Sequence, residues 1–494
     1  MHLKHIEDWW YNRVVTTKHT KHHAIFEVIM RQKRNLKLQL FFTSVPEIQI
    51  PNGRDAIYCL LRGIQEIYDH SDAITELILN DLSEQGKRKV WLGAKGMTAW
   101  QVFMLAVLRL NLGKTFDELE FNFNHNLLIR KFLELNHDDN VTYFSSRTLN
   151  HNYDRLNATT LNKINEIIVE KSIKESFEDG KVVRGDSFVC DSNVHFPTDQ
   201  SLIADGCRKV IQVCAPFSGW RQHKHLLKKS RRLAHDVSKS KRGRNSDVRS
   251  LKDYRNQFKF AKMIISKGLE TLEQLALDAP ERRTLVYFLS GLEYVRDIAE
   301  RRVVNGEKIE HTEKVCSLFE PHVEMINRVK FPQPFQLGHR VLLTQGESGI
   351  VLTCKVMDTG FQDVDELLPA LQELNEKYGK LKVANFDKGY WSPINTEKSS
   401  KYVEKLVVAR KGKGTEESRQ AEREPEFVKY RVWRSGVEAL ISVCVRSNRL
   451  DRCRDKGKDS FDTWVHAAIV TRKLIQLGKL CIEREKNKTE RRRA

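Results

Sequence analysis

The first third of the chain carries apolar residues at helical spacing, interrupted by residues that favour the start of a helix. Thr98 with Gln101 matches the capping-box pattern, in which the two residues satisfy each other's backbone donors. Thr115 with Glu118 repeats this pattern. Because an apolar run follows each pair, each pair predicts the start of a helix.

Two more helices are expected nearby, at 148–156 and 160–171. We therefore predict a mostly helical region at 1–90, followed by a module of short helices at 91–175. A module of this kind can dock onto DNA. A helical packing domain without DNA contact fits the pattern equally well, because spacing alone identifies no recognition helix.

Beyond residue 180 the apolar positions form shorter runs that are typical of β-strands. The predicted strands lie at 181–190, 337–343, 350–357, 381–386 and 405–409. Between the third and the fourth of these, an apolar face from Val364 to Leu374 predicts a helix over 363–378. Strands and helices in this order predict an α/β fold, in which a mixed sheet is flanked by helices.

The long interval between the first and the second predicted strand is not strand-like. Apolar residues recur there at helical steps from Leu251 to Leu272 and from Leu285 to Val303, which predicts a helical hairpin. The expected organisation is a helical region at 1–90, a helical module at 91–175, a sheet domain at 176–205 and 310–482, a basic helical insertion at 206–309, and a basic tail at 483–494.

Composition narrows the class of protein. The 494 residues are 40% hydrophobic and 30% charged, which is typical of a soluble globular protein. No segment approaches about 18 uninterrupted apolar residues, and no apolar stretch follows the first charges. Nine scattered cysteines form no C-x-x-C pair, so reduced thiols are expected. We therefore expect a cytoplasmic protein with no membrane partner.

The net charge of +19 favours a polyanionic partner, above all nucleic acid. The positive charge is concentrated at 221–245, which holds ten lysines or arginines and one acid. The candidate DNA-binding residues in and near this run are Lys228, Lys229, Arg231, Arg232, Lys241, Arg242 and Arg244. The alternative interpretation is a solvated flexible segment without a partner.

Three acidic residues occupy positions at which a sheet domain would expose them together. Asp186 lies within the first predicted strand, and Asp387 directly follows the fourth, where ligands of α/β sheets tend to bind. Glu438 lies in a helix predicted over 430–445, one turn beyond Arg434.

Two strand aspartates and a helix glutamate can hold two Mg²⁺ ions through oxygen ligands, an arrangement suited to phosphodiester displacement. Plainer interpretations exist. A lone aspartate at a strand end is usually a cap or turn residue, and a glutamate four residues from an arginine is usually a surface ion pair.

The segments that contain these acids stand in a fixed order: GDSFVCDSNVHFPTD at 185–199, FDKGYWSP at 386–393 and RSGVEALIS at 434–442. Each resembles a segment of the DDE transposases of bacterial insertion sequences, which have an RNase H-like catalytic core. In that family the three segments carry the first aspartate, the second aspartate and the final glutamate. The similarity covers roughly residues 90 to 480 and is weakest in the helical insertion.

The resemblance implies that Asp186, Asp387 and Glu438 coordinate two Mg²⁺ or Mn²⁺ ions. It implies nicking at transposon ends, followed by strand transfer of the freed 3′-hydroxyl into target DNA. The expected partner is double-stranded DNA, both the ends and the target, with Lys388 and Arg434 among the DNA contacts. Because two ends must be paired, a homo-oligomer is expected, in the bacterial cytoplasm and on the nucleoid when DNA is bound.

The sequence departs from the family pattern in places. Lys388 stands where arginine is commoner, which keeps the charge but loses a bidentate grip on phosphate. Tyr430 stands four residues before Arg434 rather than three, so its equivalence to the family's tyrosine is open. Asp191 and Asp199 lie close enough along the chain to stand in for Asp186.

Other residues and functions remain as alternatives. His195 and His339 are candidate bases, but two-metal chemistry needs none, so packing or hydrogen-bonding roles are favoured. Trp391 is either a stacking platform for an extruded base or a packing residue. The hairpin at 251–303 is either an oligomer interface or packs on its own core. The alternative functions are an RNase H-like nuclease without strand transfer, and a catalytically inactive DNA-binding protein derived from a transposase.

Overall fold

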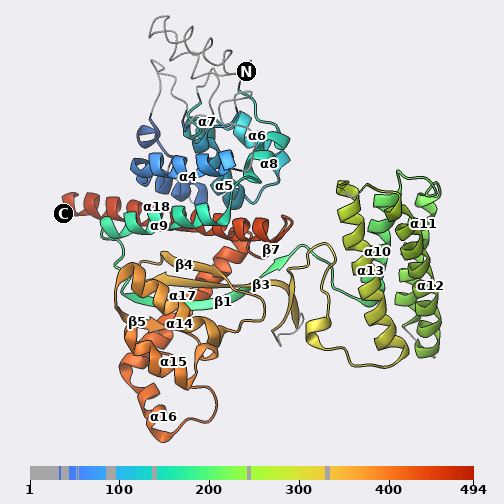
Figure 1. Ribbon diagram of the computed structural model, residues 1–494. Helices are drawn as coiled ribbons and strands as arrows, with labels where there is room; N and C mark the ends of the chain where they lie inside the picture. The colour runs from blue at the N-terminus through green and yellow to red at the C-terminus, as the bar shows by residue number, and fades with distance from the viewer. Residues whose placement is uncertain are drawn as a thin grey trace, which may run out of the picture. The chain divides into compact units, whose positions relative to one another are not determined.

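The computed structural model of the chain divides into two compact units (Figure 1). The described residues are 33–34, 44–51, 53, 55–84, 96–135, 142–241, 246–276, 278–328 and 334–493. The sheet unit comprises the described residues up to Asp191 and from His339 onward, and the helical unit spans Ser192–Gly338.

One layer of the sheet unit is formed by helices from the first third of the chain together with the C-terminal helix (Figure 1). These helices are α3 (Ala56–Glu66), α4 (Ser71–Glu84), α5 (Ala99–Leu112), α6 (Phe116–His125), α7 (Leu127–Phe132), α8 (Ser146–Tyr153), α9 (Ala158–Lys174) and α18 (Lys458–Arg493), with 3₁₀ turns at Val45–Glu47 and Tyr68–His70. Both predicted capping boxes are present, at the starts of α5 and α6. Residues 483–493, predicted as a basic tail, continue α18.

Two glycines allow the backbones of α3 and α18 to approach each other closely. A Cβ added at Gly478 would lie 1.9 Å from the carbonyl oxygen of Cys59. A Cβ added at Gly63 would lie 2.0 Å from the carbonyl oxygen of Leu474. Because both obstacles are backbone atoms, a larger residue at either position would force the two helices apart.

We therefore expect Gly478→Ala to lower the free energy of unfolding by about 1–3 kcal/mol, the usual cost of overpacking a core. Alanine is the better helix former by about 1 kcal/mol, so a loss of stability isolates the steric effect. Urea unfolding followed by circular dichroism measures it, with Lys479→Ala on the exposed side of α18 as the control. Unchanged stability of Gly478→Ala would mean that α3 and α18 do not pack this closely.

The sheet lies next to this helical layer, with its strands in the order β4-β3-β1-β5-β6 and β7 beside β1. The strands are β1 (Val182–Ser192), β3 (Phe335–Gly346), β4 (Val351–Val356), β5 (Leu381–Asn385), β6 (Val403–Val407) and β7 (Arg452–Cys453). β3 and β4 pair antiparallel, whereas β1, β5 and β6 pair parallel. The sheet is therefore mixed and open, as the sequence predicted.

Helices cover both faces of the parallel strands. The remaining helices of this region are α14 (Asp363–Tyr378), α15 (Pro393–Lys398), α16 (Glu416–Arg423) and α17 (Pro425–Ser447), with 3₁₀ turns at Lys388–Tyr390 and Ser399–Lys401. Val183 packs in one core with Leu367 and Leu371 of α14. Val182, the preceding residue, packs instead with Trp433 of α17. Because successive side chains of a strand point to opposite faces, α14 and α17 cover opposite faces of the sheet.

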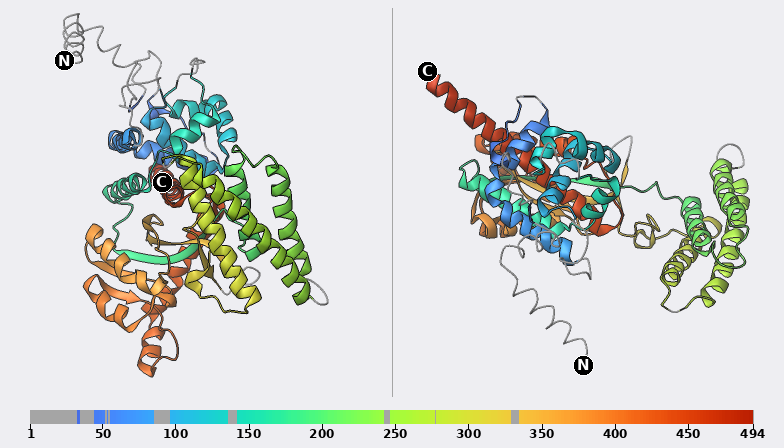
Figure 2. Two further views of the ribbon diagram at one scale, coloured as in Figure 1. Left: turned by 45° about the vertical axis from the view of Figure 1, so that its right-hand side comes forward. Right: turned by 90° about the horizontal axis from the view of Figure 1, so that it is seen from above.

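Within its described residues, the helical unit contains four helices that lie side by side (Figure 2). They are α10 (Asp199–Cys214), α11 (His223–Ser240), α12 (Ser246–Glu273) and α13 (Pro280–Val304), followed by a 3₁₀ turn at His311–Glu313 and by β2 (Glu324–Asn327), which pairs antiparallel with the first residues of β3. The predicted hairpin corresponds to α12 and α13. The unit extends beyond the expected insertion at 206–309 because α10 packs against both of these helices.

Two further features concern the cysteines and the hydropathy of the helices. All nine cysteines have free thiols in the structure. In the described ranges, no helix is both long enough and apolar enough to cross a membrane.

Candidate active site

Three acidic side chains converge on one arginine at an end of the parallel strands. The Arg434 guanidinium lies 3.5 Å from a carboxylate oxygen of Asp186, measured from Nη1. Its Nη2 atom lies 3.6 Å from Asp387 and 3.2 Å from Glu438. The structure thus brings together the three acids that the sequence singled out, around the arginine that was expected beside them.

The fold explains this convergence. Arg184 is the register partner of Asn385 in the parallel pair of β1 and β5. Asp186 follows Arg184 by two residues, and Asp387 likewise follows Asn385 by two. Both aspartates therefore leave neighbouring strands on the same face of the sheet. Helix α17 covers that face, and Arg434 and Glu438, four residues apart, share one side of it.

The three acids of the site differ in how far their side chains are exposed to solvent. The side chain of Asp186 is 21% exposed, that of Asp387 is 44% exposed and that of Glu438 is 61% exposed. Burial is the main cause that raises the pKa of Asp186 to about 6, and the negative charge of Asp387 adds to this effect. The Ser187 backbone N–H and the Arg434 guanidinium act in the opposite direction. Asp186 is thus the least solvated acid of the three.

A fourth acid, which the sequence analysis did not single out, lies near Asp186. Asp363, the first residue of α14, accepts a 2.6 Å hydrogen bond from the Ser187 hydroxyl. The guanidinium of Arg340 lies 3.7 Å from the same carboxylate. Tyr390 is buried beside this group, and burial together with Asp363 and Asp186 raises the pKa of its hydroxyl. The only signal of Asp363 in the sequence is its place at the start of a helix.

The other aspartates near the first segment lie elsewhere. Asp191 is 3.8 Å from Arg452, and its backbone N–H donates to the Asp451 carbonyl. Asp199 belongs to the helical unit, where it pairs with Arg302. Asp186 is therefore the acid of this segment that meets Asp387 and Glu438.

The histidines that were weighed as bases have other surroundings. His195 lies in the helical unit, 2.6 Å from Asp205. Burial alone would lower the pKa of His195, but hydrogen bonds to Asp205 and to the Phe196 carbonyl raise it. His339 is buried, with its ring 4.9 Å from the ring of Phe461 in an edge-on contact. Both arrangements favour the packing and hydrogen-bonding interpretation.

The residues that flank the acids divide into packing and exposed groups. Tyr430 packs against the sheet face beneath α17, which accounts for it without a role in chemistry. Lys388 is exposed beside Asp387. Trp391 is partly buried, and the Arg410 guanidinium lies 5.3 Å from the centre of its ring.

The set of three carboxylates suits hard divalent cations, which prefer oxygen ligands. The acids surround a guanidinium, so a cation already fills the space between them. Within the described part of the chain, no three histidine, cysteine or acidic side chains stand close enough together to hold one metal ion. Binding of metal at these residues therefore requires Arg434 to move out and the carboxylates to close in.

Residues 223–240 of the basic run form the helix α11. Leu226 and Val237 face the core of the helical unit, whereas Lys228, Arg231 and Arg232 are exposed. The exposed cations of α11 that form no ion pair with any described residue are Lys224, Lys228, Arg231, Arg232 and Lys239. A continuous positive face results.

The other candidate DNA-binding residues of the run either contact other side chains or lie outside the described residues. Lys229 lies 5.5 Å from the ring centre of Phe260. Lys241 donates a 3.0 Å hydrogen bond to Gln200, and burial lowers its pKa. Arg242 and Arg244 lie outside the described residues. Lys228, Arg231 and Arg232 are thus the candidates best placed to meet a ligand.

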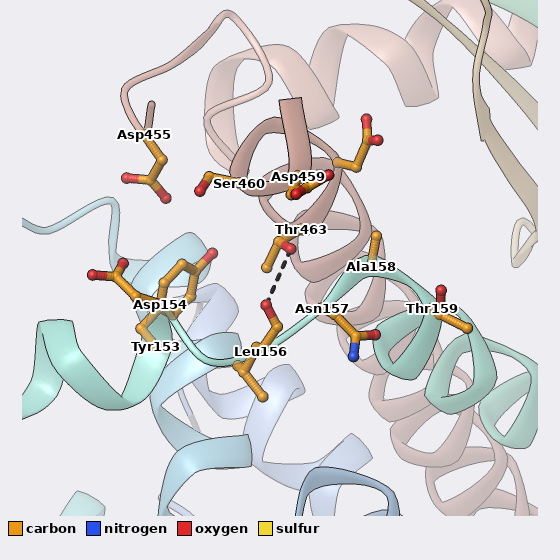
Figure 3. A pocket seen from close by; sticks show the side chains of 11 residues that line it. Tyr153, Asp154, Leu156, Asn157, Ala158, Thr159, Asp455, Asp459, Ser460 and Thr463 are labelled. Atoms are coloured by element: carbon orange, nitrogen blue, oxygen red, sulfur yellow. Dashed lines mark hydrogen bonds between the residues drawn. The ribbon is translucent and has the colours of Figure 1, made fainter. Parts of the chain in front are cut away.

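A separate cavity of about 300 Å³ lies at the starts of α9 and α18 (Figure 3). Four acids line it: Asp154, Asp455, Asp459 and Asp462. Asp455 is held by Arg109 through two hydrogen bonds of 2.7 and 2.8 Å. A lining of this charge repels phosphate, so the cavity does not suit nucleic acid.

Comparison of the chain with family models, with curated proteins and with solved structures finds no match. The assignment of function therefore depends on the residues of the site, their geometry and the resemblance of the segments that carry them.

Proposed function

We propose that this protein is a DNA transposase that cuts at transposon ends and joins the freed 3′-hydroxyl to target DNA. One observation carries the proposal. Asp186, Asp387 and Glu438 come from separate segments of the chain, and their carboxylates all lie within 3.6 Å of one guanidinium. A chance grouping of unrelated surface acids would not coincide with the three segments that resemble the transposase family.

The sheet supports an RNase H-like core for this enzyme. The antiparallel pair β3 and β4 lies on one side of β1, and the parallel strands β5 and β6 lie on the other. This order makes β1 and β5 neighbours, so the acids at the ends of both can serve one site. Ligands of open α/β sheets bind at such carboxyl ends.

In the proposed reaction, Asp186, Asp387 and Glu438 would hold two Mg²⁺ or Mn²⁺ ions. When bound, these ions would activate the attacking oxygen and stabilise the departing one. Arg434 would leave the carboxylates and donate to a DNA phosphate, for which its planar guanidinium is suited. Lys388 would supply a further positive charge to the DNA backbone. The exposure of Glu438 and Asp387 leaves this side of the site open to a large substrate.

The helical unit would contribute phosphate contacts through α11. Lys228 and Arg231 are exposed three residues apart, and Arg232 adjoins them, so their charges line one side of the helix. Such contacts with phosphate confer affinity without sequence preference. We propose duplex DNA as their partner, and a homo-oligomer as the form that pairs two ends.

Binding of duplex DNA should accordingly depend steeply on salt. Each phosphate contact contributes about 0.9 to the slope of log K against log salt concentration, so replacing Lys228, Arg231 and Arg232 together with alanine should reduce the slope by about 3. Fluorescence anisotropy with a labelled duplex at several salt concentrations measures this slope. The charge-preserving variant Lys228→Arg, Arg231→Lys, Arg232→Lys should keep the original slope. An alanine variant with the original slope would exclude α11 from the DNA interface.

A strand-transfer assay tests the function itself. The substrates are a supercoiled target plasmid and precut duplexes taken from the DNA that flanks the coding sequence, with Mg²⁺ in one reaction and EDTA in the other. Joined product that requires Mg²⁺ is expected. Cleavage without joining would instead identify an RNase H-like nuclease. Binding with neither reaction would identify a DNA-binding protein that lacks catalysis.

A further inference from the structure

Two polar side chains of the sheet hold the backbone of helix α17. Arg184 on β1 donates a hydrogen bond from Nη1 to the carbonyl oxygen of Trp433. Asn385 on β5 donates from Nδ2 to the carbonyl oxygen of Tyr430, one turn earlier in the helix. Because Arg184 and Asn385 are register partners, the two contacts stand side by side on adjacent strands.

Arg184 is itself fixed from three directions. Its Nε atom donates a 2.8 Å hydrogen bond to Gln345 on β3. Its guanidinium lies 4.4 Å from the ring centre of Trp433, a cation–π contact. Gly436 leaves room for it, since a Cβ at that position would lie 2.1 Å from Nη1. The guanidinium therefore fits into a gap in the side-chain surface of α17.

These contacts lie next to the candidate catalytic residues. Arg184 and Asn385 each precede an aspartate of the site by two residues and point to the same face of the sheet. On the helix, the bound carbonyl of Trp433 immediately precedes Arg434, and Gly436 precedes Glu438 by two residues. A slide or rotation of α17 on the sheet would move Glu438 relative to both aspartates.

We propose that Arg184, Asn385 and Gly436 form a clamp that sets the register of α17 on the sheet and so positions Glu438 opposite Asp186 and Asp387. This inference rests on the proposed function, because it assigns positioning residues to the same site. The clamp acts on the helix backbone and does not touch the substrate. The apolar packing of α17 is separate from the clamp, because it comes from the buried side chains of Val437 and Leu440.

Gly436→Ala tests the clamp, because it fills the gap and displaces the Arg184 guanidinium. Alanine favours helix over glycine, so the variant should unfold at the same temperature as the parent or higher. If the clamp positions Glu438, the single-turnover cleavage rate should fall about tenfold or more, as for the loss of other supporting contacts at metal sites. DNA affinity should stay the same. Full activity together with raised stability would overturn the inference.

Two controls separate positioning from damage. Ser435→Ala changes the adjacent, exposed position of α17 and should leave the cleavage rate unchanged. In an Arg184→Ala background the guanidinium is already gone, so adding Gly436→Ala should cost little more. Fully additive losses in the double variant would mean that Gly436 does not act through Arg184.

Hydrogen exchange tests the clamp without any catalytic readout. Amides of residues 430–438 should exchange faster in Gly436→Ala than in the parent, despite the better helix former, and should be unchanged in Ser435→Ala. Slower exchange in Gly436→Ala would contradict the clamp. If the parent neither cuts nor joins DNA while the exchange result holds, the proposed function fails and the clamp remains.

Discussion

Glu438→Gln is expected to reduce DNA cleavage more than about a hundredfold, since the loss of a metal ligand should exceed the effect of losing one of its supporting contacts. Glutamine keeps the size of the side chain and removes the charge that would hold a divalent cation. Glu438 is 61% exposed and its pair with Arg434 is a surface contact on one helix, so the fold should not depend on it. The variant should therefore bind duplex DNA as the parent does.

A matched control lies on the same helix. Glu426, near the start of α17, pairs with Lys405 and is 57% exposed, so Glu426→Gln removes a comparable charge away from the three acids. Cleavage by this variant should equal that of the parent. Assays with a supercoiled plasmid and a precut duplex measure both variants. Cleavage that survives Glu438→Gln would remove this residue from the site.

Lys473→Met is expected to raise the stability of the sheet unit at neutral pH. Lys473 is almost fully buried in α18, and its ammonium donates to the Asn165 carbonyl at 3.1 Å and to the Leu352 carbonyl at 3.4 Å. No carboxylate forms an ion pair with it among the described residues. Burial lowers the pKa of Lys473 to about 7. The folded protein therefore disfavours a charge that the unfolded chain carries freely.

The sign of the pH effect follows from that shift. The ordinary pKa is 10.5, so between pH 7 and pH 10.5 the unfolded chain binds more protons at this residue than the folded protein does. Stability contributed by this group therefore rises with pH across that window. Each pKa unit corresponds to about 1.4 kcal/mol, so the full effect is on the order of 5 kcal/mol.

Urea unfolding of the parent and the variant from pH 6 to pH 10 tests this expectation. Lys473→Met should be the more stable protein at pH 6, and the difference should shrink toward pH 10. Lys479→Met, at an exposed position of the same helix, should differ from the parent by less than about 0.5 kcal/mol at every pH. A parent that is more stable than Lys473→Met at pH 6 would show that the two carbonyl hydrogen bonds outweigh the cost of burial.

The sequence predicted those parts of the fold that depend on local pattern. β5 and α14 were located from their apolar residues, and the α5 and α6 starts from capping boxes. The helix predicted over 430–445 lies within α17. Asp186 and Asp387 could be proposed for the same reason, because Asp186 lies within a strand and Asp387 directly after one, and each strand is defined by its own residues. The helix within the run at 221–245 was harder to predict, because the charged residues obscured the helical spacing of Leu226 and Val237. These two side chains are buried and pack α11 against the other helices of the unit.

Contacts between distant segments could not be predicted. Asp363 joins the site through Ser187, which is 176 residues away, and nothing in the pattern around either residue indicates that contact. Arg184 and Asn385 were visible only as polar residues in buried strands. Their partners are backbone carbonyls of α17, and a backbone acceptor leaves no trace in the sequence.

Arg434 connects the geometry of the site with its proposed chemistry. In this structure its single positive charge offsets part of the repulsion among three carboxylates. The same residue would be displaced when divalent cations bind. Binding of metal should therefore be accompanied by rotation of the Arg434 side chain.

A crystal structure of the protein with Mn²⁺ and a precut DNA end, with the ions located by their anomalous signal, would show which side chains hold the metal. Two ions about 3.5–4 Å apart are expected, in contact with carboxylate oxygens of Asp186, Asp387 and Glu438, and Arg434 should be turned away from them. Ions bound elsewhere, or an Arg434 guanidinium still lying among the three acids at saturating Mn²⁺, would contradict this expectation.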